Sequence, residues 1–470
     1  MREVKWRRRE LKTEAERCGV SAEKTREYVA KLSRMINCKT VWTREGENRA
    51  EYQRFYKVLE ELFPTLTAKA EKLTFGDGCF VYVIRGKNAI KNWMLMSHHD
   101  VVEGSDGWET DPFCATEKDG YLYGRGTIDT KTPLFAELQA AEELLTEGYE
   151  FDGINLYIGS SHNEEVCGDG MVLASDYFRE QGIRFELVLD EGGAITEGQI
   201  PGVSCKSAVV AVHEKSRHMY RCTAQIDPKG HRGFGGARDS AVERLSGFIT
   251  EVSDQSKKIY QGQFYPEVRA TFERHVPYMS FPMNVLFGNI GLFAPIIKKI
   301  MMGIPAASAM LSTGLSFTTL KGGDEQEPQV RAKSAETTMF LRCIREEDLY
   351  AGLETIREIG KKYGVEVQEI ERDYCEPTDF EGEIYQMVEA QLHENFPDVI
   401  VVPFLLTAGT DARRFTGIAD NILRFAPIDL NKAQFATIHN DNEHIGVKNI
   451  GQCVAFYKDV IRRGAEGKRV

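Results

Sequence analysis

Short apolar runs that end in histidine or carboxylate side chains occur three times in the first half of the sequence. Helical patterns separate these runs, and such an alternation of strands and helices indicates βαβ units with a largely parallel sheet. Because the carboxyl ends of parallel strands meet at one edge of a sheet, we expect the polar groups to lie together. The runs are residues 93–96, 154–158 and 185–189, and they lead into His98 and Asp100, Glu164 and Glu165, and Asp190 and Glu191.

The rest of the pattern predicts an α/β fold with helices packed around this sheet. One helix should follow Thr132, the expected N-cap, with Pro133 in its first position and Gly148 just past its end. Further helices are expected at residues 21–37, 48–63, 171–180, 383–394 and 447–462, and further strands at 79–84 and 399–404; another apolar segment occupies residues 421–425.

A smaller α+β unit begins at about residue 217. Its expected strands are residues 219–226, 336–344 and 365–371, and its expected helices are 239–252 and 346–360. The predicted division is therefore a first domain in two parts, residues 1–216 and 375–470, interrupted by an insertion, residues 217–374. A glycine-rich segment of the insertion, residues 230–236, fits neither a P-loop nor a dinucleotide fingerprint.

Composition and charge exclude several classes of protein. Hydrophobic residues at 42% and charged residues at 28% are typical of a soluble globular chain. The net charge of −12 argues against a nucleic-acid partner, which needs a basic face, and the only compact basic run, residues 7–9, is expected to be solvated. The ten cysteines include no C-x-x-C pair, which is typical of a reduced cytoplasmic protein without disulfides or a thiolate zinc site.

One segment has the length of a membrane span, since residues 300–320 carry no charge. We expect no membrane crossing. Gly303, Pro305 and many serines and threonines make the segment too polar, and Lys298 and Lys299 precede it. A buried or partner-facing segment is expected instead.

The polar groups at the strand ends suit a metal site. Adjacent carboxylates cost free energy unless a cation or a proton separates them. Glu164 and Glu165 point in different directions if the backbone is extended, so one can bind metal while its neighbour holds water. His98 with Asp100 can supply a metal ligand and its supporting carboxylate. Any one of these pairs could instead consist of exposed turn residues without a ligand. Because three strand ends of the same sheet carry such groups, we favour the metal site.

Six motifs together resemble the M20 metallopeptidases, nearest to the carboxypeptidase S and PM20D1-like branch. No single motif would suffice, and the specificity comes from their order. They are His98-x-Asp100, Gly124-Arg125-Gly126-x-x-Asp129-x-Lys131, Glu164-Glu165, Asp190-Glu191-Gly192-Gly193, Gly409-Thr410-Asp411-Ala412-Arg413, and His439 with Glu443 four residues later.

The resemblance implies a zinc-peptidase catalytic domain with a mostly parallel sheet, and a lid or dimerisation domain inserted into it. Asp129 would bridge two zinc ions, or cobalt or manganese ions in their place. His98 and Asp190 would complete one site, and Glu165 and His439 the other. Such nitrogen and oxygen ligands suit zinc with an open position for water.

The resemblance also assigns catalytic roles. Asp100 would be the carboxylate that supports the ligand His98. Glu164 would be the general base that takes a proton from the reacting water. His231 matches a lid histidine that donates to the oxyanion, although Arg232 follows it where the family usually has serine. Thr130 departs from the usual second aspartate after the bridging residue.

Substrate binding is expected in the loop that contains Gly409, Thr410 and Arg413. The guanidinium of Arg413 could hold the substrate's terminal carboxylate through two parallel hydrogen bonds. The alternative is an internal ion pair with a neighbouring carboxylate such as Asp411 or Asp420.

The predicted function is hydrolysis, with metal, of an amide or peptide bond adjacent to a free carboxylate, as in a carboxypeptidase or dipeptidase. An N-acyl-amino-acid amidohydrolase with the same dinuclear site is the first alternative. A catalytically silent relative that binds peptide or metal is the second, and the intact Glu164 argues against it. We expect a cytoplasmic homodimer that acts on a small peptide or N-acyl amino acid, without a nucleic-acid or membrane partner.

Overall fold

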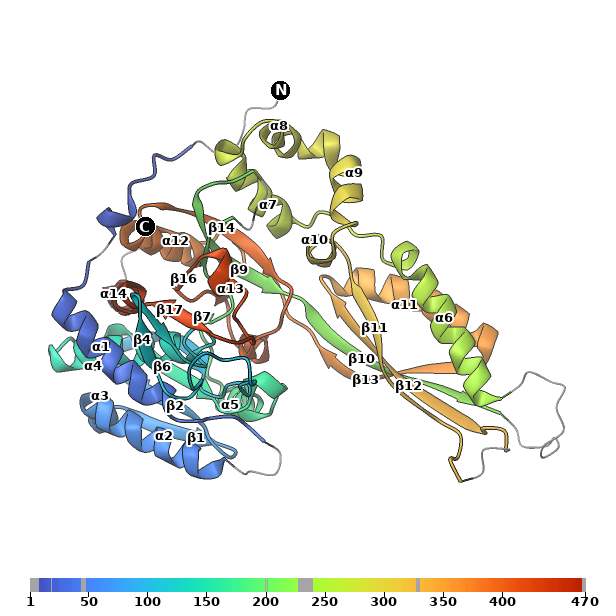
Figure 1. Ribbon diagram of the computed structural model, residues 1–470, viewed down its shortest axis with the longest axis horizontal. Helices are drawn as coiled ribbons and strands as arrows, with labels where there is room; N and C mark the ends of the chain where they lie inside the picture. Colours follow the sequence, from blue (N-terminus) through green and yellow to red (C-terminus); the bar gives the residue numbers. More distant parts are fainter. Residues whose placement is uncertain are drawn as a thin grey trace.

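A ten-stranded mixed sheet forms the centre of the larger domain (Figure 1). The computed structural model describes residues 8–17, 19–43, 48–198, 200, 202–226, 240–326 and 330–466. The strands lie in the order β1 (Glu71–Phe75), β2 (Cys79–Ile84), β6 (Asp152–Ser161), β3 (Lys87–His98), β7 (Leu187–Asp190), β15 (Ile422–Arg424), β9 (Lys206–Glu214), β8 (Ile195–Thr196) and β16 (Asp429–Leu430), and β14 (Val399–Leu406) pairs with β9.

The centre of this sheet is parallel and covered on both faces. β6, β3, β7 and β15 run in the same direction. Leu95 of β3 packs into the core on one face, whereas Met94 and Met96 pack into a second core on the other face. Burial on both faces explains why the strand is a continuous apolar run. The predicted α/β class with a largely parallel sheet is confirmed.

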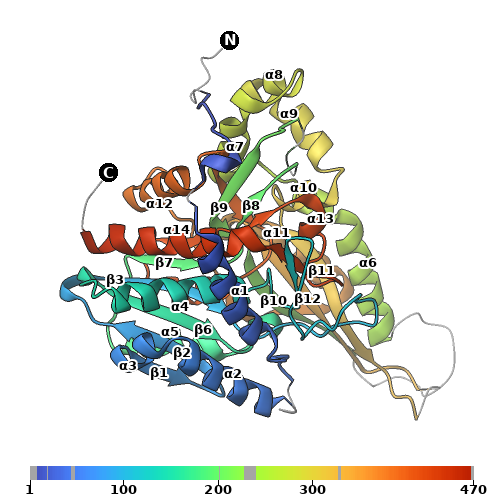
Figure 2. The same ribbon diagram turned by 60° about the vertical axis from the view of Figure 1, so that its left-hand side comes forward.

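Helices from both ends of the chain cover one face of the sheet. α4 (Lys131–Thr146) and α14 (Val447–Glu466) pack side by side (Figure 2). α5 (Gly170–Glu180) covers the opposite face. The other helices around this domain are α1 (Ala22–Ile36), α2 (Arg49–Leu62), α3 (Pro64–Lys69), α12 (Glu383–Asn395) and α13 (Lys432–Phe435).

The helix expected after Thr132 begins slightly earlier, at Lys131, with Thr130 as its N-cap. The hydroxyl of Thr132 donates to the carbonyl oxygen of Thr127 at 2.6 Å and therefore does not cap the helix. The helix ends before Gly148, as the sequence predicts.

A four-stranded antiparallel sheet forms a separate unit that extends away from the larger domain (Figure 1). Its strands lie in the order β11 (Gly314–Gly322), β12 (Ser334–Cys343), β10 (Ser216–Gln225) and β13 (Val365–Asp373). α6 (Ala241–Ile259) and α11 (Glu346–Tyr363) share one apolar core with it. We call this unit the lid.

The middle of the predicted insertion does not pack on the lid sheet. α7 (Pro266–His275) lies against β14 of the large sheet, and α8 (Met283–Gly288), α9 (Ile290–Met301) and α10 (Pro305–Ala309) follow it. The uncharged stretch at residues 300–320 thus contains the end of α9, α10 and most of β11. Within the described part of the chain, no helix combines the length and the hydropathy that a bilayer crossing requires.

Candidate metal centre

The two carboxylate oxygens of Asp129 face two different histidines. His98, the last residue of β3, has its Nε2 atom 3.0 Å from Asp129 Oδ1. His439 has its Nε2 atom 3.0 Å from Asp129 Oδ2 and also 3.0 Å from Glu165 Oε2. One carboxylate between two sets of ligands is the arrangement that a bridging ligand of two metal ions needs.

The donor set fits a divalent cation. His98, Asp129 and Glu165 each offer one ligand atom, and these atoms lie within 4.8 Å of one another. The Oε1 atom of Glu165 is buried and has no hydrogen-bond partner among the described residues. Burial raises the pKa values of the carboxyl groups of Glu164 and Glu165 above their usual range. A cation among these groups would remove that penalty.

The two carboxylates beside His439 favour its protonated form. Its hydrogen bonds to Asp129 and Glu165 raise its pKa to about 10. A metal ligand must be a neutral imidazole, so binding of metal here releases a proton.

Asp100 organises both halves of the centre. Its backbone carbonyl lies 3.0 Å from Nδ1 of His98, and its Oδ1 atom lies 3.4 Å from the same nitrogen. Its two carboxylate oxygens accept hydrogen bonds from the backbone N–H groups of Glu164 and Glu165, at 3.2 and 3.0 Å. Asp100 therefore fixes the His98 ring and also the turn that presents the predicted general base.

Thr130, the residue after the candidate bridging ligand, has a hydroxyl that joins two segments. Its Oγ1 atom accepts a hydrogen bond from the backbone N–H of His98 at 3.1 Å and donates to the His98 carbonyl at 3.0 Å. One hydroxyl thus satisfies both backbone groups at the end of β3 and holds Asp129 beside His98.

Glu443 holds the loop that carries Asp129, a role that sequence reasoning did not assign. Its fully buried carboxylate accepts hydrogen bonds from the backbone N–H groups of Gly126, Ile128 and Asp129, at 2.7 to 3.1 Å. It also forms an ion pair with buried Arg125 at 2.8 Å. The Gly-Arg-Gly motif and the Glu443 motif are therefore two halves of one loop anchor.

Asp190, the predicted ligand beside His98, is the last residue of β7, and it stays a predicted metal ligand. Its Oδ1 atom accepts a hydrogen bond from the backbone N–H of Glu191 at 2.9 Å, and its Oδ2 atom accepts one from Ala412 at 2.8 Å. The neighbouring Glu191 lines the cavity beside Asp129. Burial and the charge of Asp129 raise the pKa of Glu191 well above its usual value. Both acids remain candidate cation ligands, because a carboxylate oxygen that accepts one hydrogen bond keeps a second lone pair.

A cavity of about 420 Å³ opens beside these carboxylates. Glu164, Glu165, Glu191, Gly409 and Thr410 line its polar part. Its apolar wall consists of Ile128, Pro133, Ala194, Ile200, Val209, Phe404, Leu406, Ala426, Ile428, Leu430, Phe435 and Ile438. The cavity can therefore hold an apolar group next to the candidate metal centre.

The structure pairs Arg413 internally. Its side chain is 4% exposed, and Nε lies 2.8 Å from Asp373 Oδ2. The internal ion pair that sequence reasoning considered is therefore present, with Asp373 in place of Asp411 or Asp420. Thr410 is also engaged, because its N–H and hydroxyl both donate to Glu214 Oε2, at 3.0 and 2.9 Å.

The guanidinium of Arg342, in β12, is less engaged than that of Arg413. Sequence reasoning did not identify Arg342. It reaches from the lid to the larger domain, where Nη1 donates to the carbonyl oxygen of Thr407 at 3.0 Å. Thr407 lines the cavity. Burial and the nearby charge of Arg413 lower the pKa of Arg342. Among the described residues no carboxylate forms an ion pair with it, whereas Arg413 pairs with Asp373.

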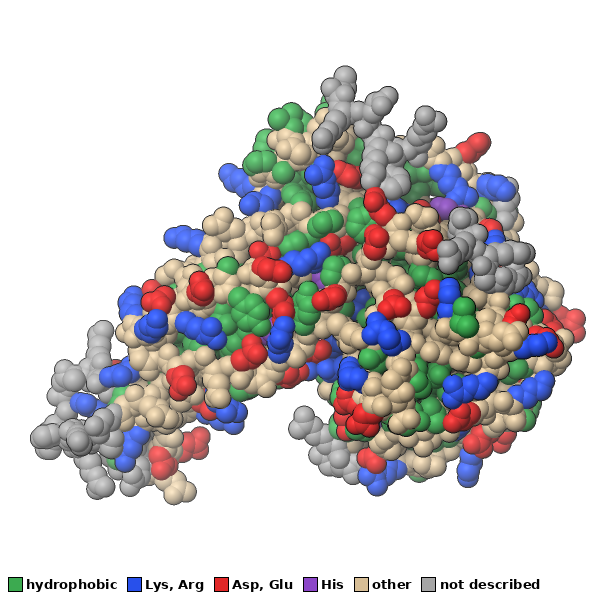
Figure 3. All heavy atoms as spheres, turned by 180° about the vertical axis from the view of Figure 1, so that it is seen from behind, with side chains coloured by type: hydrophobic (Ala, Val, Ile, Leu, Met, Phe, Trp, Pro, Cys, Tyr) green, Lys and Arg blue, Asp and Glu red, His purple; other side chains and the backbone are tan. Residues whose placement is uncertain are grey.

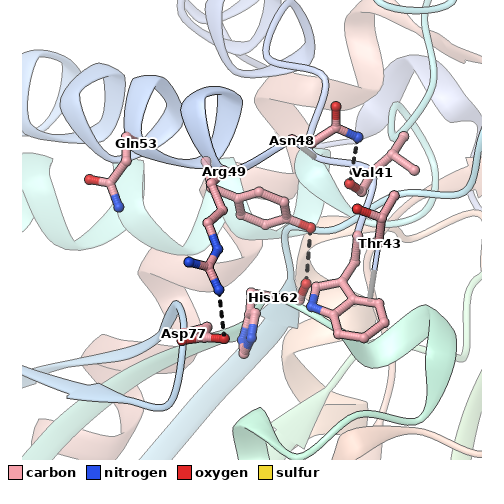
Figure 4. A pocket seen from close by; sticks show the side chains of 9 residues that line it. Val41, Thr43, Asn48, Arg49, Gln53, Asp77 and His162 are labelled. Atoms are coloured by element: carbon pink, nitrogen blue, oxygen red, sulfur yellow. Dashed lines mark hydrogen bonds and ion pairs between the residues drawn. The ribbon is translucent and has the colours of Figure 1, made fainter. Parts of the chain in front are cut away.

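A second, polar cavity lies around His162, and none of the candidate ligands lines it (Figure 4). Its polar groups serve internal contacts: Asn48 donates to the Val41 carbonyl, Arg49 pairs with Asp77, and Tyr52 donates to the His162 carbonyl at 3.0 Å. Tyr52 thus supports the segment that leads to Glu164. His231, the predicted lid histidine, lies outside the described residues.

Comparison with known proteins identifies the family. The family model for peptidase family M20/M25/M40 matches residues 94–463. The chain belongs to the M20 peptidase family. The predicted resemblance is therefore confirmed, and the chain is a hydrolytic enzyme that cleaves amide bonds with metal.

Curated relatives and solved structures agree with this assignment. The chain is 29% identical to the N-fatty-acyl-amino acid synthase/hydrolase PM20D1 of Xenopus tropicalis, over 97% of this chain and 89% of that protein. It is 27% identical to the probable carboxypeptidase S-like 2 of Dictyostelium discoideum, over 93% and 85%. The fold matches the M20 metallo-carboxypeptidase Sso-CP2 of Sulfolobus solfataricus with a TM-score of 0.66 and 16% identity, over 94% and 99%.

The adjacent acids Asp190 and Glu191 lead to a test of metal content. We expect Asp190→Asn to lower metal affinity by at least about 10-fold to 100-fold, the cost typical of losing even an outer-shell partner. Glu191→Gln, at the neighbouring position, should retain the metal. Metal content by mass spectrometry checks both. Loss of metal in Glu191→Gln alone would exclude Asp190 as a ligand and assign its role to Glu191.

Proposed function

We propose that this enzyme cleaves an amide bond adjacent to a free carboxylate, with two zinc ions held by His98, Asp129, Glu165, Asp190 and His439. The observation that carries the proposal is the placement of Asp129, whose two oxygens each face a different histidine at 3.0 Å. Glu191 lines the cavity beside these ligands. When bound, the metal ions would polarise the scissile carbonyl and lower the pKa of water.

The protein's own groups move the proton and position the substrate. Glu164 accepts a proton from the attacking water at its carboxylate and then delivers it to the leaving nitrogen. Asp100 holds the Glu164 backbone in place through its 3.2 Å hydrogen bond. The apolar wall of the cavity receives the acyl side of the substrate and excludes water from it.

Arg342 is our candidate for the group that binds the substrate carboxylate. It reaches the cavity rim from the lid and lacks a described carboxylate partner, whereas Arg413 already pairs with Asp373. An Arg342 contact would couple closure of the lid to substrate binding. His231 remains our proposed oxyanion donor, from the same or a second subunit of a cytoplasmic homodimer.

A substrate panel tests this function. Purified protein with zinc, cobalt or manganese is assayed on dipeptides and on N-acyl amino acids that carry short or long apolar acyl groups. We expect hydrolysis that a chelator abolishes and that increases with the apolar character of the acyl side. The panel also separates a peptidase from an N-acyl-amino-acid hydrolase. Hydrolysis that persists after complete metal removal would contradict the proposal.

The carboxylate contact predicts a specific kinetic effect. Arg342→Ala should lower kcat/KM about 10-fold to 100-fold, because a hydrogen bond to a charged group contributes roughly 1.5–3 kcal/mol. The loss should disappear when the substrate carboxylate is amidated, since the amide cannot use the guanidinium. Arg413→Ala serves as the comparison and should mainly lower stability. A loss that is equal for acid and amide would exclude Arg342 from this role.

A further inference from the structure

Six large apolar side chains are exposed on α8, α9 and the segments that flank them. We call this surface the apolar cap. Its members and their exposed fractions are Phe281 (80%), Val285 (45%), Leu292 (75%), Ile296 (55%), Ile300 (57%) and Ile304 (51%). Such a concentration on one surface is unusual for a soluble monomer and indicates an interaction site.

The exposed side chains of the apolar cap are not needed to pack α9 onto the rest of the protein. α9 already buries Ile290, Ile297 and Met301 against the core beneath it. Leu292, Ile296 and Ile300 recur every four residues on another side of the same helix and remain exposed. A helix that is apolar on its inner and outer sides is expected to have a second apolar environment.

The charges around the apolar cap favour a binding partner with an anionic surface. The chain carries 71 acidic residues, yet residues 274–323 contain none. Lys298 and Lys299 lie in the last turn of α9. Arg8 and Arg9, from the basic run at the start of the chain, contact Tyr278, three residues before Phe281. Figure 3 shows hydrophobic side chains gathered at this upper end of the molecule with Lys and Arg beside them.

We propose that the apolar cap docks this protein on the surface of an anionic lipid bilayer. The apolar side chains would enter the boundary between headgroups and acyl chains, and the lysines and arginines would meet lipid phosphates. A second copy of the chain fits less well, because a twofold contact would bring the cationic groups of both copies together. α8 and α9 also protrude from the molecule (Figure 1). A deformable lipid surface accommodates such a protrusion more readily than the flat surface of a protein partner does.

The apolar cap adjoins the catalytic cavity. Ile200 and Phe404 line the cavity and also pack against the apolar core beneath α8 and α9. A docked enzyme would therefore hold its cavity close to apolar molecules in the bilayer. The docking itself does not depend on the proposed substrate.

Vesicle flotation with the purified full chain tests the proposal. Vesicles of phosphatidylcholine alone are compared with vesicles that also contain phosphatidylserine. We expect binding to the anionic vesicles that weakens with salt. Replacing Leu292 and Ile296 together with Ser should lower the bound fraction at least about tenfold, because two of the six exposed apolar side chains of the apolar cap become polar. Lys299→Glu should weaken binding to anionic vesicles in particular.

Matched substitutions elsewhere serve as controls. Ile90→Ser removes an equally exposed apolar side chain outside the apolar cap, and Lys257→Glu reverses a charge on α6. Both should bind like wild type, and all variants should retain hydrolysis of a water-soluble substrate. Absence of binding by wild type, or equal losses in the controls, would overturn the proposal. A concentration-dependent dimer that the Leu292 and Ile296 change disrupts would instead assign the apolar cap to self-association.

Discussion

Replacing Glu164 with Gln should lower kcat by about 10²-fold to 10⁴-fold, the range typical of removing a general base. The amide cannot accept the proton of the attacking water, although it occupies nearly the same space. Metal content should stay near that of wild type, because Glu164 is not among the candidate ligands. The backbone N–H of Glu164 would still donate to Asp100, so the turn should keep its position.

The neighbouring residue provides the matched control for this prediction. Glu165→Gln changes the same chemical group one position along the chain, but it removes an oxygen that lies 3.0 Å from His439. We expect this variant to lose both metal and turnover. The pair is measured by steady-state kinetics and by metal analysis on the same samples. Wild-type kcat in Glu164→Gln would remove Glu164 from the mechanism.

Glu443→Gln should lower the free energy of unfolding by about 3–5 kcal/mol, the cost of breaking a buried ion pair by removing one partner. Arg125 would be left buried and uncompensated, and the amide would accept fewer of the backbone hydrogen bonds from residues 126–129. Because these bonds hold Asp129, metal affinity should fall as well. Chemical denaturation and metal titration measure the two effects.

A double substitution separates the ion pair from the backbone anchor. Replacing Arg125 and Glu443 together with Met removes both buried charges, and stability should recover part of the loss seen in Glu443→Gln. Metal affinity should remain low, since no acceptor replaces the carboxylate. Recovery of full metal affinity in the double variant would show that Glu443 does not position Asp129.

The fold could be predicted largely from local patterns. Each central strand is buried on both faces, so it appears as an apolar run, and each run ends where the polar groups begin. Helix limits were less certain. The helix expected from Thr132 begins at Lys131 because Thr132 bonds to Thr127 and Thr130 takes the N-cap position.

The candidate site could be predicted in part. The motifs named His98, Asp129, Glu165 and His439, and the structure brings these four together. The motif also named Asp190 as a ligand, and this stays a prediction.

The roles of three further residues depend on tertiary contacts that the sequence does not reveal. Arg413 pairs with Asp373 from the end of a lid strand, and Arg342 comes from another lid strand. Neither pairing has a signal in local sequence. Glu443 was visible as a motif, but its partners lie more than 300 residues away, so its role as a loop anchor required the fold.

The anchoring of Asp129 by Glu443 also bears on how the enzyme is made. During synthesis the loop with Asp129 leaves the ribosome long before Glu443 and His439 do, and the whole lid is translated in between. Contacts of such long sequence separation form late, since loop closure must precede them. The nascent chain should therefore be unable to hold its metal ions or to attack amide bonds until its final segment has docked. The enzyme would thus hydrolyse no amide bonds near the ribosome before its folding is complete.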